Sequence, residues 1–471
     1  MRKLLWLLSS VALMSLEACS LAPTYERPAL ELDQQWPLNP SSQNSVAQLN
    51  WERLYPDARL QALIRAALER NHDLRIAVAR QQQARALWGV QKADQWPAVT
   101  IDVSGNGTRI PSGIQGNPSA LELKSETAGL SLLSYEVDLW GRVANLTDIA
   151  KANFVASEED RRTVYLGLIS DVANAYWQLQ ELQERFALAH QTEQTRADSL
   201  HLTQAKRDAG SASDWDVLAS QASLAAAQAD AASLDRQQQQ ASNALKLLLG
   251  GQWPANLPAP VALSEQVVPM ALMADLPSEV LLRRPDVRSA EQKLIAANAN
   301  IGVARAAYLP KISLTGSFGS ASTSMSSLFT SGSRDWSFSP AVSAPLFDSG
   351  HISSTVEAAK AQQVQAVAAY EKTIYQAFRE VADLLVAQST LKAQWQAQNE
   401  ATQSQVLRLQ MVEKRYALGS ASQLELLDAQ RDAYAAQQAL LQVRRQMFAN
   451  TALLYKALGG GNEPQNTAQN S

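Results

Sequence analysis

The chain has 471 residues, a formal net charge of −4 and an aromatic content of 6%. This charge excludes the strongly basic surface that nucleic-acid binding requires. No phosphate-binding glycine loop, metal-ligand cluster, nucleophile elbow or triad pattern occurs in the sequence, so we predict neither an enzyme nor a protein with a bound metal or cofactor.

The N-terminus resembles a bacterial lipoprotein signal. A basic start precedes an apolar run over residues 4–16, which is too short for a comfortable transmembrane helix. The run leads to Cys19, the only cysteine of the chain. We predict a signal peptide at 1–18 and a covalent lipid on Cys19 that anchors the mature chain to a membrane. Glu17 is unusual in such a signal, so a plain signal peptide stays the alternative. The residue after the cysteine is Ser20 and not an aspartate, which resembles the sorting signal of lipoproteins that are delivered to the outer membrane.

Residues 19–56 are rich in Pro, Ser, Asn and Gln. The prolines prevent regular structure, so this segment is predicted to be a lipid-anchored extended arm. Apolar residues at helical spacing follow from Asp57 to Asp94, with a break near Asn71. Pro97 ends the helical region because the residue before a proline avoids the helical conformation.

Two strands are expected near 98–109 and 126–138. Val99, Ile101 and Val103 alternate with polar residues, and alternation returns from Ala128 to Val137. Strands of about ten residues with one apolar face are typical of transmembrane β-strands. A soluble hairpin on a small domain would show the same alternation.

The second half of the chain repeats the first. Gly302-Val303 matches Gly89-Val90 at an offset of 213 residues, and two further strands are expected near 311–321 and 335–346. After the strands the offset falls to 209 residues, as from Gly210 to Gly419. The loops between the strands therefore differ in length, as exposed loops do. We predict a first structural repeat at 57–251, a linker at 252–276, a second repeat at 277–461 and a disordered tail at 462–471.

Each second strand leads into a very long helical segment, over about 143–209 and 352–418, and a return helix follows over 214–249 and 423–458. The turns between them, at 210–216 and 419–425, share one pattern. A glycine suits the end of one helix, and Ser-x-x-Asp or Ser-x-x-Glu is the capping box that begins the next. The tip residues are Gly210, Ser211, Ser213, Gly419, Ser420 and Ser422.

The last helix carries two apolar seams with steps of three and four. One runs through Leu424, Leu427, Tyr434, Leu441 and Phe448, and the other through Leu426, Ala433, Ala436, Leu440, Val443, Met447 and Leu454. Packing within one helical hairpin requires only one such apolar seam on each helix. The second seam therefore indicates another neighbouring helix on the other side, as in a tube of helices. One wide core-facing stripe is the alternative.

Four strands cannot close a barrel by themselves, and open edges in lipid would leave backbone groups unpaired at several kcal/mol each. If the strands span a membrane, the chain must form oligomers. A dimer would supply eight strands, which side chains fill, whereas a trimer would supply twelve, which can leave a lumen. The long helices favour the open, trimeric version.

The sequence resembles the TolC-like outer-membrane efflux channels, and most of all their OprM-like lipoprotein branch. The resemblance covers nearly the whole chain and is carried by the segments ACSLAPTYERP at 18–28, YEVDLWGR at 135–142, LRRPDV at 282–287, PLFD at 345–348 and LLDAQR at 426–431. It implies an α+β membrane protein that forms a homotrimer, with a twelve-stranded barrel among outer-membrane lipid and a periplasmic helical tunnel. It also implies a periplasmic adaptor, which would meet the tips, and an inner-membrane pump of the RND class. The function implied is passive exit of drugs and other small molecules.

The resemblance also places a gate in the first turns after the second tip. Leu424, Asp428 and Arg431 have the spacing i, i+4, i+7 and share one helix face. Three copies of Leu424 would form an apolar constriction, three copies of Asp428 a carboxylate ring, and Arg431 would hold the tip shut. The first repeat has Trp215, Ala219 and Ala222 in these places. An ordinary Asp428–Arg431 pair on a solvated face is the alternative.

Two other classes of protein fit part of the pattern. A cell-surface coiled-coil protein would explain the helices but not the alternating segments. The channel of a type I protein secretion system would have a similar tunnel, but the lipoprotein signal and the motif set favour drug efflux.

Overall fold

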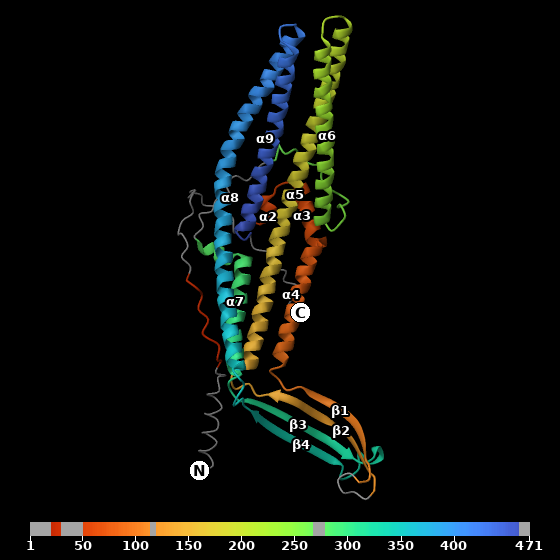
Figure 1. Ribbon diagram of the computed structural model, residues 1–471, viewed down its shortest axis with the longest axis vertical. Helices are drawn as coiled ribbons and strands as arrows, with labels where there is room; N and C mark the ends of the chain where they lie inside the picture. The colour runs from red at the N-terminus through yellow and green to blue at the C-terminus, as the bar shows by residue number, and fades with distance from the viewer. Residues whose placement is uncertain (1–19, 30–49, 114–118, 267–277, 461–471) are drawn as a thin grey trace. The chain divides into compact units, whose positions relative to one another are not determined.

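The computed structural model describes residues 20–29, 50–113, 119–266 and 278–460 (Figure 1). The predicted signal peptide, Cys19 and the predicted tail lie outside these residues, as do parts of the arm and the linker. The chain divides into two compact units. The first unit comprises Met1–Leu30, Arg80–Glu158 and Ser289–Glu371, and the second comprises Glu31–Ala79, Glu159–Arg288 and Lys372–Ser471.

Within residues 20–29 and 50–98, three helices precede the first strand: α2 (Trp51–Leu54), α3 (Ala58–Arg70) and α4 (His72–Ala93). The side chain of Asp57 accepts backbone hydrogen bonds at the start of α3. The break between α3 and α4 is at Asn71, whose backbone is extended and whose side chain accepts a bond from the Leu74 amide. An extended residue whose side chain caps the next turn ends one helix and begins another. The short helix α2 was not predicted.

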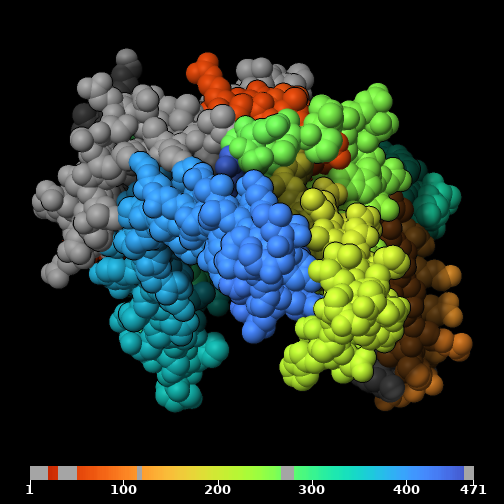
Figure 2. All heavy atoms as spheres, turned by 90° about the horizontal axis from the view of Figure 1, so that it is seen from above, coloured from red at the N-terminus to blue at the C-terminus, as the bar shows by residue number. Residues whose placement is uncertain are grey.

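The two long helices have the same length. Helix α5 (Arg142–Asp208) and helix α8 (His351–Ala417) contain 67 residues each, which is about 100 Å at the helical rise. The return helices α6 (Asp214–Leu248) and α9 (Gln423–Ala457) contain 35 residues each. This equality of length agrees with an internal duplication. Viewed from above, the α5–α6 hairpin in yellow-green lies next to the α8–α9 hairpin in blue (Figure 2).

The second repeat opens with the 3-10 turn η2 (Ser278–Arg283) and helix α7 (Pro285–Ala306), and a further 3-10 turn, η3 (Met325–Ser327), lies between its strands. No helix in the described part of the chain is both long and apolar enough to cross a membrane.

The four strands form one antiparallel sheet in the order β1-β2-β3-β4. They are β1 (Val99–Ile110), β2 (Leu121–Glu136), β3 (Lys311–Ser322) and β4 (Arg334–Ser343). Strand β2 begins at Leu121 instead of near 126, and β4 ends at Ser343 instead of near 346. The last pair of the β3–β4 ladder joins Ser343 to Lys311, the first residue of β3.

The core of the second unit lies where α3, α5 and α9 meet. Trp177 of α5 packs between Tyr55 and Phe448, with ring centroids 5.7 and 5.1 Å away. Along α9, the seam with Leu426 and Ala433 is buried, whereas Leu424 at the head of the other seam is exposed. Phe448 belongs to that other seam and is buried, so both predicted seams are used within the chain and Leu424 is the exposed end of one of them.

Candidate functional site

The register of the sheet separates an apolar face from a polar one. Directly paired residues lie on the same face, and the row Ile101–Leu130–Phe318–Trp336 crosses all four strands. The neighbouring rows add Val99, Val103, Leu132, Tyr135, Ile312, Leu314, Phe338, Pro340 and Val342. These rows span about nine residues of β3, close to the 9–11 residues with which a tilted strand crosses a bilayer.

The opposite face carries hydroxyl and carboxylate groups. Thr100 and Ser131 both donate to the carboxylate of Asp102, and Ser317 and Ser337 share a hydrogen bond of 2.7 Å. A sheet with one apolar and one polar face suits a wall between lipid and water.

Beyond these rows the two faces exchange character. Glu122 and Lys124 of β2 lie on the same face of the sheet as the apolar rows. Leu121 and Leu123 lie on the opposite face. This inversion explains why the start of β2 was missed: charged residues at the apolar positions of the pattern hid the strand.

The hairpin tips have the geometry that their sequences indicate. Gly210 and Gly419 have φ of 73° and 72°, a left-handed conformation that glycine adopts without strain. The Ser211 and Ser420 hydroxyls donate to the carbonyls of Lys206 and Arg415. Ser213 and Ser422 form complete capping boxes with Asp216 and Glu425. The left-handed backbone of the two glycines and the hydrogen bonds of the four serines therefore account for all six predicted tip residues.

The three predicted gate residues share one exposed stripe at the start of α9. Leu424 is 69% exposed. Arg431 lies 3.0 Å from Asp428 and 3.1 Å from Asp432, which also accepts a bond of 2.9 Å from Arg408 of α8. Within one chain, Arg431 thus pairs with two acids of its own helix, and Leu424 has no apolar cover.

Two links between the hairpins were not predicted. Gln423 donates to Ser220 Oγ of α6 at 2.5 Å and to the Asp216 carbonyl at 3.1 Å. Further along, the Tyr434 hydroxyl donates to Asp230. Burial and the neighbouring Asp230 carboxylate raise the pKa of Tyr434, so its hydroxyl stays protonated and remains a donor. Because these partners lie far apart in sequence, periodicity could not identify them.

The segment directly after Cys19 packs on the first unit. Ser20 donates to Asn145 of α5 at 3.0 Å, and the carbonyls of Leu21 and Pro23 accept bonds from Arg305 and Asn298 of α7. Arg27 and Tyr25 both donate to Glu291. The arm next to the predicted lipidation site is therefore held on two helices.

Comparison with known proteins agrees with this architecture. The family model described as outer membrane efflux protein matches residues 63–251 and 276–460. The chain is similar to the solvent efflux pump outer membrane protein SrpC of Pseudomonas putida, with 40% identity over 96% of this chain and 97% of that protein. It is also similar to the outer membrane protein OprJ of Pseudomonas aeruginosa, with 38% identity over 95% and 94%.

A solved structure has the same fold. The open state of the Neisseria gonorrhoeae MtrE outer membrane channel superposes with a TM-score of 0.85 and 36% identity, covering 94% of this chain and 98% of that one. The predicted combination of membrane strands and long helical hairpins is thereby confirmed. The efflux relatives do not favour the secretion alternative. The chain belongs to the outer membrane efflux protein family and is the outer-membrane channel component of an efflux pump, with its helical hairpins in the periplasm.

Proposed function

We propose that three copies of this chain join at β1 and β4 to close a twelve-stranded barrel. Both strands pair on one side only, so each offers a free edge to a neighbouring copy. An edge in lipid would leave backbone donors and acceptors without partners. On α9, the exposed Leu424 and the half-buried Leu427 and Leu441 offer an apolar surface to a helix of a neighbouring copy. A covalent lipid on Cys19 would anchor the folded chain to the membrane, because the neighbouring Ser20 is bound to Asn145 of α5. No other cofactor is needed for passive exit.

The partners proposed are a periplasmic adaptor that meets the tips 210–216 and 419–425 and an inner-membrane pump of the RND class. The tips support this role because most of their residues are exposed and their own hydrogen bonds fix the glycine and serine positions. Cargo would be delivered by the pump. The names of the relatives, which include solvent and antibiotic efflux proteins, support small organic molecules as the cargo.

The gate proposed is the ring made by three copies of Leu424, Asp428 and Arg431. The observation that carries it is the exposed stripe that these residues form on α9. The corresponding positions of α6 have Trp215, Ala219 and Ala222, so the stripe is not a by-product of the repeated hairpin. Three facing carboxylates repel one another and attract cations, and Arg431 beside each acid offsets that repulsion when the ring is tight.

Single-channel recording in planar bilayers tests the gate. Asp428→Ala and Arg431→Ala should each raise the conductance, and the double variant should raise it further. Arg207→Ala is the matched control, because it removes an exposed cation near the other tip that pairs with Asp208 and Asp214 and lies outside the stripe. Unchanged conductance in both single variants and in the double variant would reject the gate and leave the ordinary helical ion pair.

A further inference from the structure

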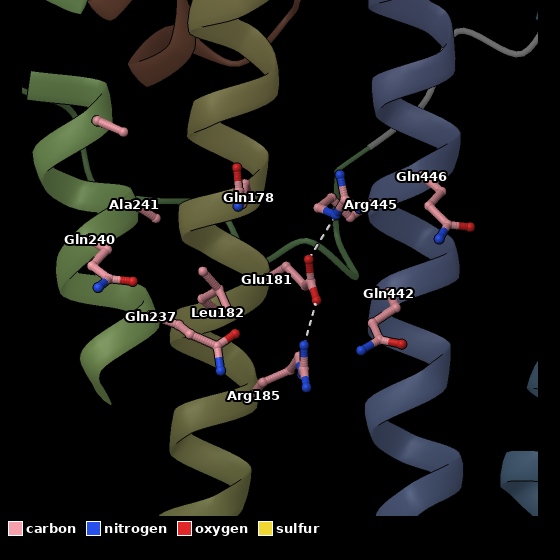
Figure 3. A pocket seen from close by; sticks show the side chains of 11 residues that line it. Gln178, Glu181, Leu182, Arg185, Gln237, Gln240, Ala241, Gln442, Arg445 and Gln446 are labelled. Carbon is pink, nitrogen blue, oxygen red and sulfur yellow. Dashed lines mark hydrogen bonds and ion pairs between the residues drawn. The ribbon is translucent and has the colours of Figure 1, made fainter. Parts of the chain in front are cut away.

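A polar cavity lies within the second unit, away from the tips. Residues of α5, α6 and α9 line it, it is open to solvent, and its volume is about 520 Å³. Its lining includes the carboxylate of Glu181, the guanidinium groups of Arg185 and Arg445, and five glutamines (Figure 3). Most ligand sites have volumes of roughly 300–1,000 Å³, so this cavity can hold a small organic molecule.

One buried acid holds both arginines. Arg185 Nη1 lies 3.0 Å from Glu181 Oε1, and Arg445 Nε lies 2.7 Å from Glu181 Oε2. Figure 3 shows the carboxylate of Glu181 between the two guanidinium groups. The side chains of Glu181, Arg185 and Arg445 are 6, 17 and 29% exposed. The lining residues therefore carry an excess of one positive charge on two partly exposed arginines.

Several donors in the cavity are unused. Arg185 Nε donates to Gln438, but within the described part of the chain Arg185 Nη2 and both terminal nitrogens of Arg445 have no protein partner. The same is true of the side-chain amides of Gln178, Gln240, Gln442 and Gln446 within those residues. Guanidinium N–H groups form a planar fork that matches a carboxylate.

Two of the three charges of the cavity are absent from the equivalent positions of the other repeat, whereas Arg445 corresponds to Arg236 of α6. At the offset of 209 residues, the positions of Glu181 and Arg185 correspond to Thr390 and Gln394 of α8. A hairpin of the same length folds in the second repeat without this acid and this arginine. Packing of the duplicated helices therefore does not by itself require the cluster.

We propose that this cavity is a binding site for a small organic anion that carries a carboxylate group. Arg445 and Arg185 hold the carboxylate, Glu181 keeps the two guanidinium groups in place, and the glutamine amides bind the polar remainder of the ligand. The site does not depend on the gate, because its residues lie outside the stripe of Leu424, Asp428 and Arg431.

The test is isothermal titration calorimetry of the full-length protein in detergent with glutarate, at constant ionic strength. Glutaramide, the neutral diamide of the same size, and inorganic phosphate are the comparison ligands. We expect saturable binding of glutarate and none of glutaramide. Absence of glutarate binding, or equal binding of glutaramide, would overturn the proposal. Tighter binding of phosphate than of glutarate would overturn the assignment to organic carboxylates.

Variants separate binding from support of the fold. Arg445→Gln and Arg185→Gln should each weaken glutarate binding about tenfold or more, because a hydrogen bond to a charged group is among the stronger ones. Glu181→Gln should tighten binding, since it removes the competing carboxylate and leaves both positive charges. Arg444→Gln is the matched control, because Arg444 donates to the carbonyls of Leu263 and Ser264 instead.

A purely structural cluster would behave differently. It would give a loss of stability in all three cavity variants and no tightening in Glu181→Gln. Weaker binding in a folded Glu181→Gln protein, or unchanged binding in Arg445→Gln, contradicts the site. If Glu181→Gln does not fold, as judged by circular dichroism, glutarate binding by the two arginine variants and the Arg444→Gln control still tests the proposed site.

Discussion

Arg27 holds Glu291 through two hydrogen bonds, of 2.8 Å from Nε and 3.0 Å from Nη2, across 264 residues of sequence. The Glu291 side chain is only 11% exposed, and Tyr25 donates to the same carboxylate. This contact fastens the arm beyond the predicted lipid to helix α7. It makes the arm part of the folded first unit rather than a tether.

Glu291→Gln should release the arm. The variant loses the charge that strengthens both arginine bonds, so we expect the amides of residues 21–29 to exchange hydrogen roughly tenfold faster or more. Hydrogen exchange with mass spectrometry measures this. The control is Glu357→Gln, which breaks an exposed pair with Lys360 on α8 and should leave exchange of the arm unchanged. Equal exchange in both variants would show that the ion pair contributes nothing to docking.

Gly302→Ala and Gly89→Ala should have opposite effects, although the two glycines are equivalent in the repeats. A Cβ at Gly302 would lie 2.6 Å from Asn145 Nδ2 and 2.8 Å from the Ala22 nitrogen, whereas nothing lies within 4 Å of one at Gly89. We expect Gly302→Ala to destabilise the protein by about 1–3 kcal/mol and Gly89→Ala to stabilise it by about 0.4–1 kcal/mol. Denaturant unfolding measures both, and a stable Gly302→Ala protein would mean that the arm moves away at no cost.

Tyr434→Phe should loosen the two hairpins, because the phenyl ring keeps its packing but cannot donate to Asp230. If the hairpins part when the channel opens, conductance in bilayers should rise. Tyr416→Phe is a matched control, since Lys206 lies 4.4 Å from the centre of that ring and a phenyl ring preserves such a contact. An increase in Tyr416→Phe alone would contradict the proposed role of Tyr434.

The capping box at the first tip should depend on pH. Hydrogen bonds from the side chain and the backbone of Ser213 hold the pKa of Asp216 below its usual range. A carboxyl with a depressed folded pKa stabilises the fold above the unfolded pKa, about 4, and loses that contribution as the pH falls through the folded pKa. The melting temperature of the wild type should therefore exceed that of Asp216→Asn at pH 7, and the difference should vanish near pH 2. A difference independent of pH would contradict this.

The sequence by itself determined the local structure. The lengths of the long helices, the break at Asn71 and the tips at Gly210 and Gly419 depend on side chains within a few residues of each backbone group, so capping and periodicity identify them. The duplication and the alternating strands also follow from patterns along the chain. The start of β2 was missed because its charged residues invert the alternation.

Only the tertiary structure decided which groups meet across long separations. Three features depend on how helices pack side by side. They are the partners of the two seams of α9, the docking of Arg27 on Glu291 and the sharing of Glu181 between Arg185 and Arg445. A single sequence records the faces of each helix but not the partner of each face. The excess positive charge of the cavity follows only from the tertiary structure, which places Arg185 and Arg445 around the single carboxylate of Glu181.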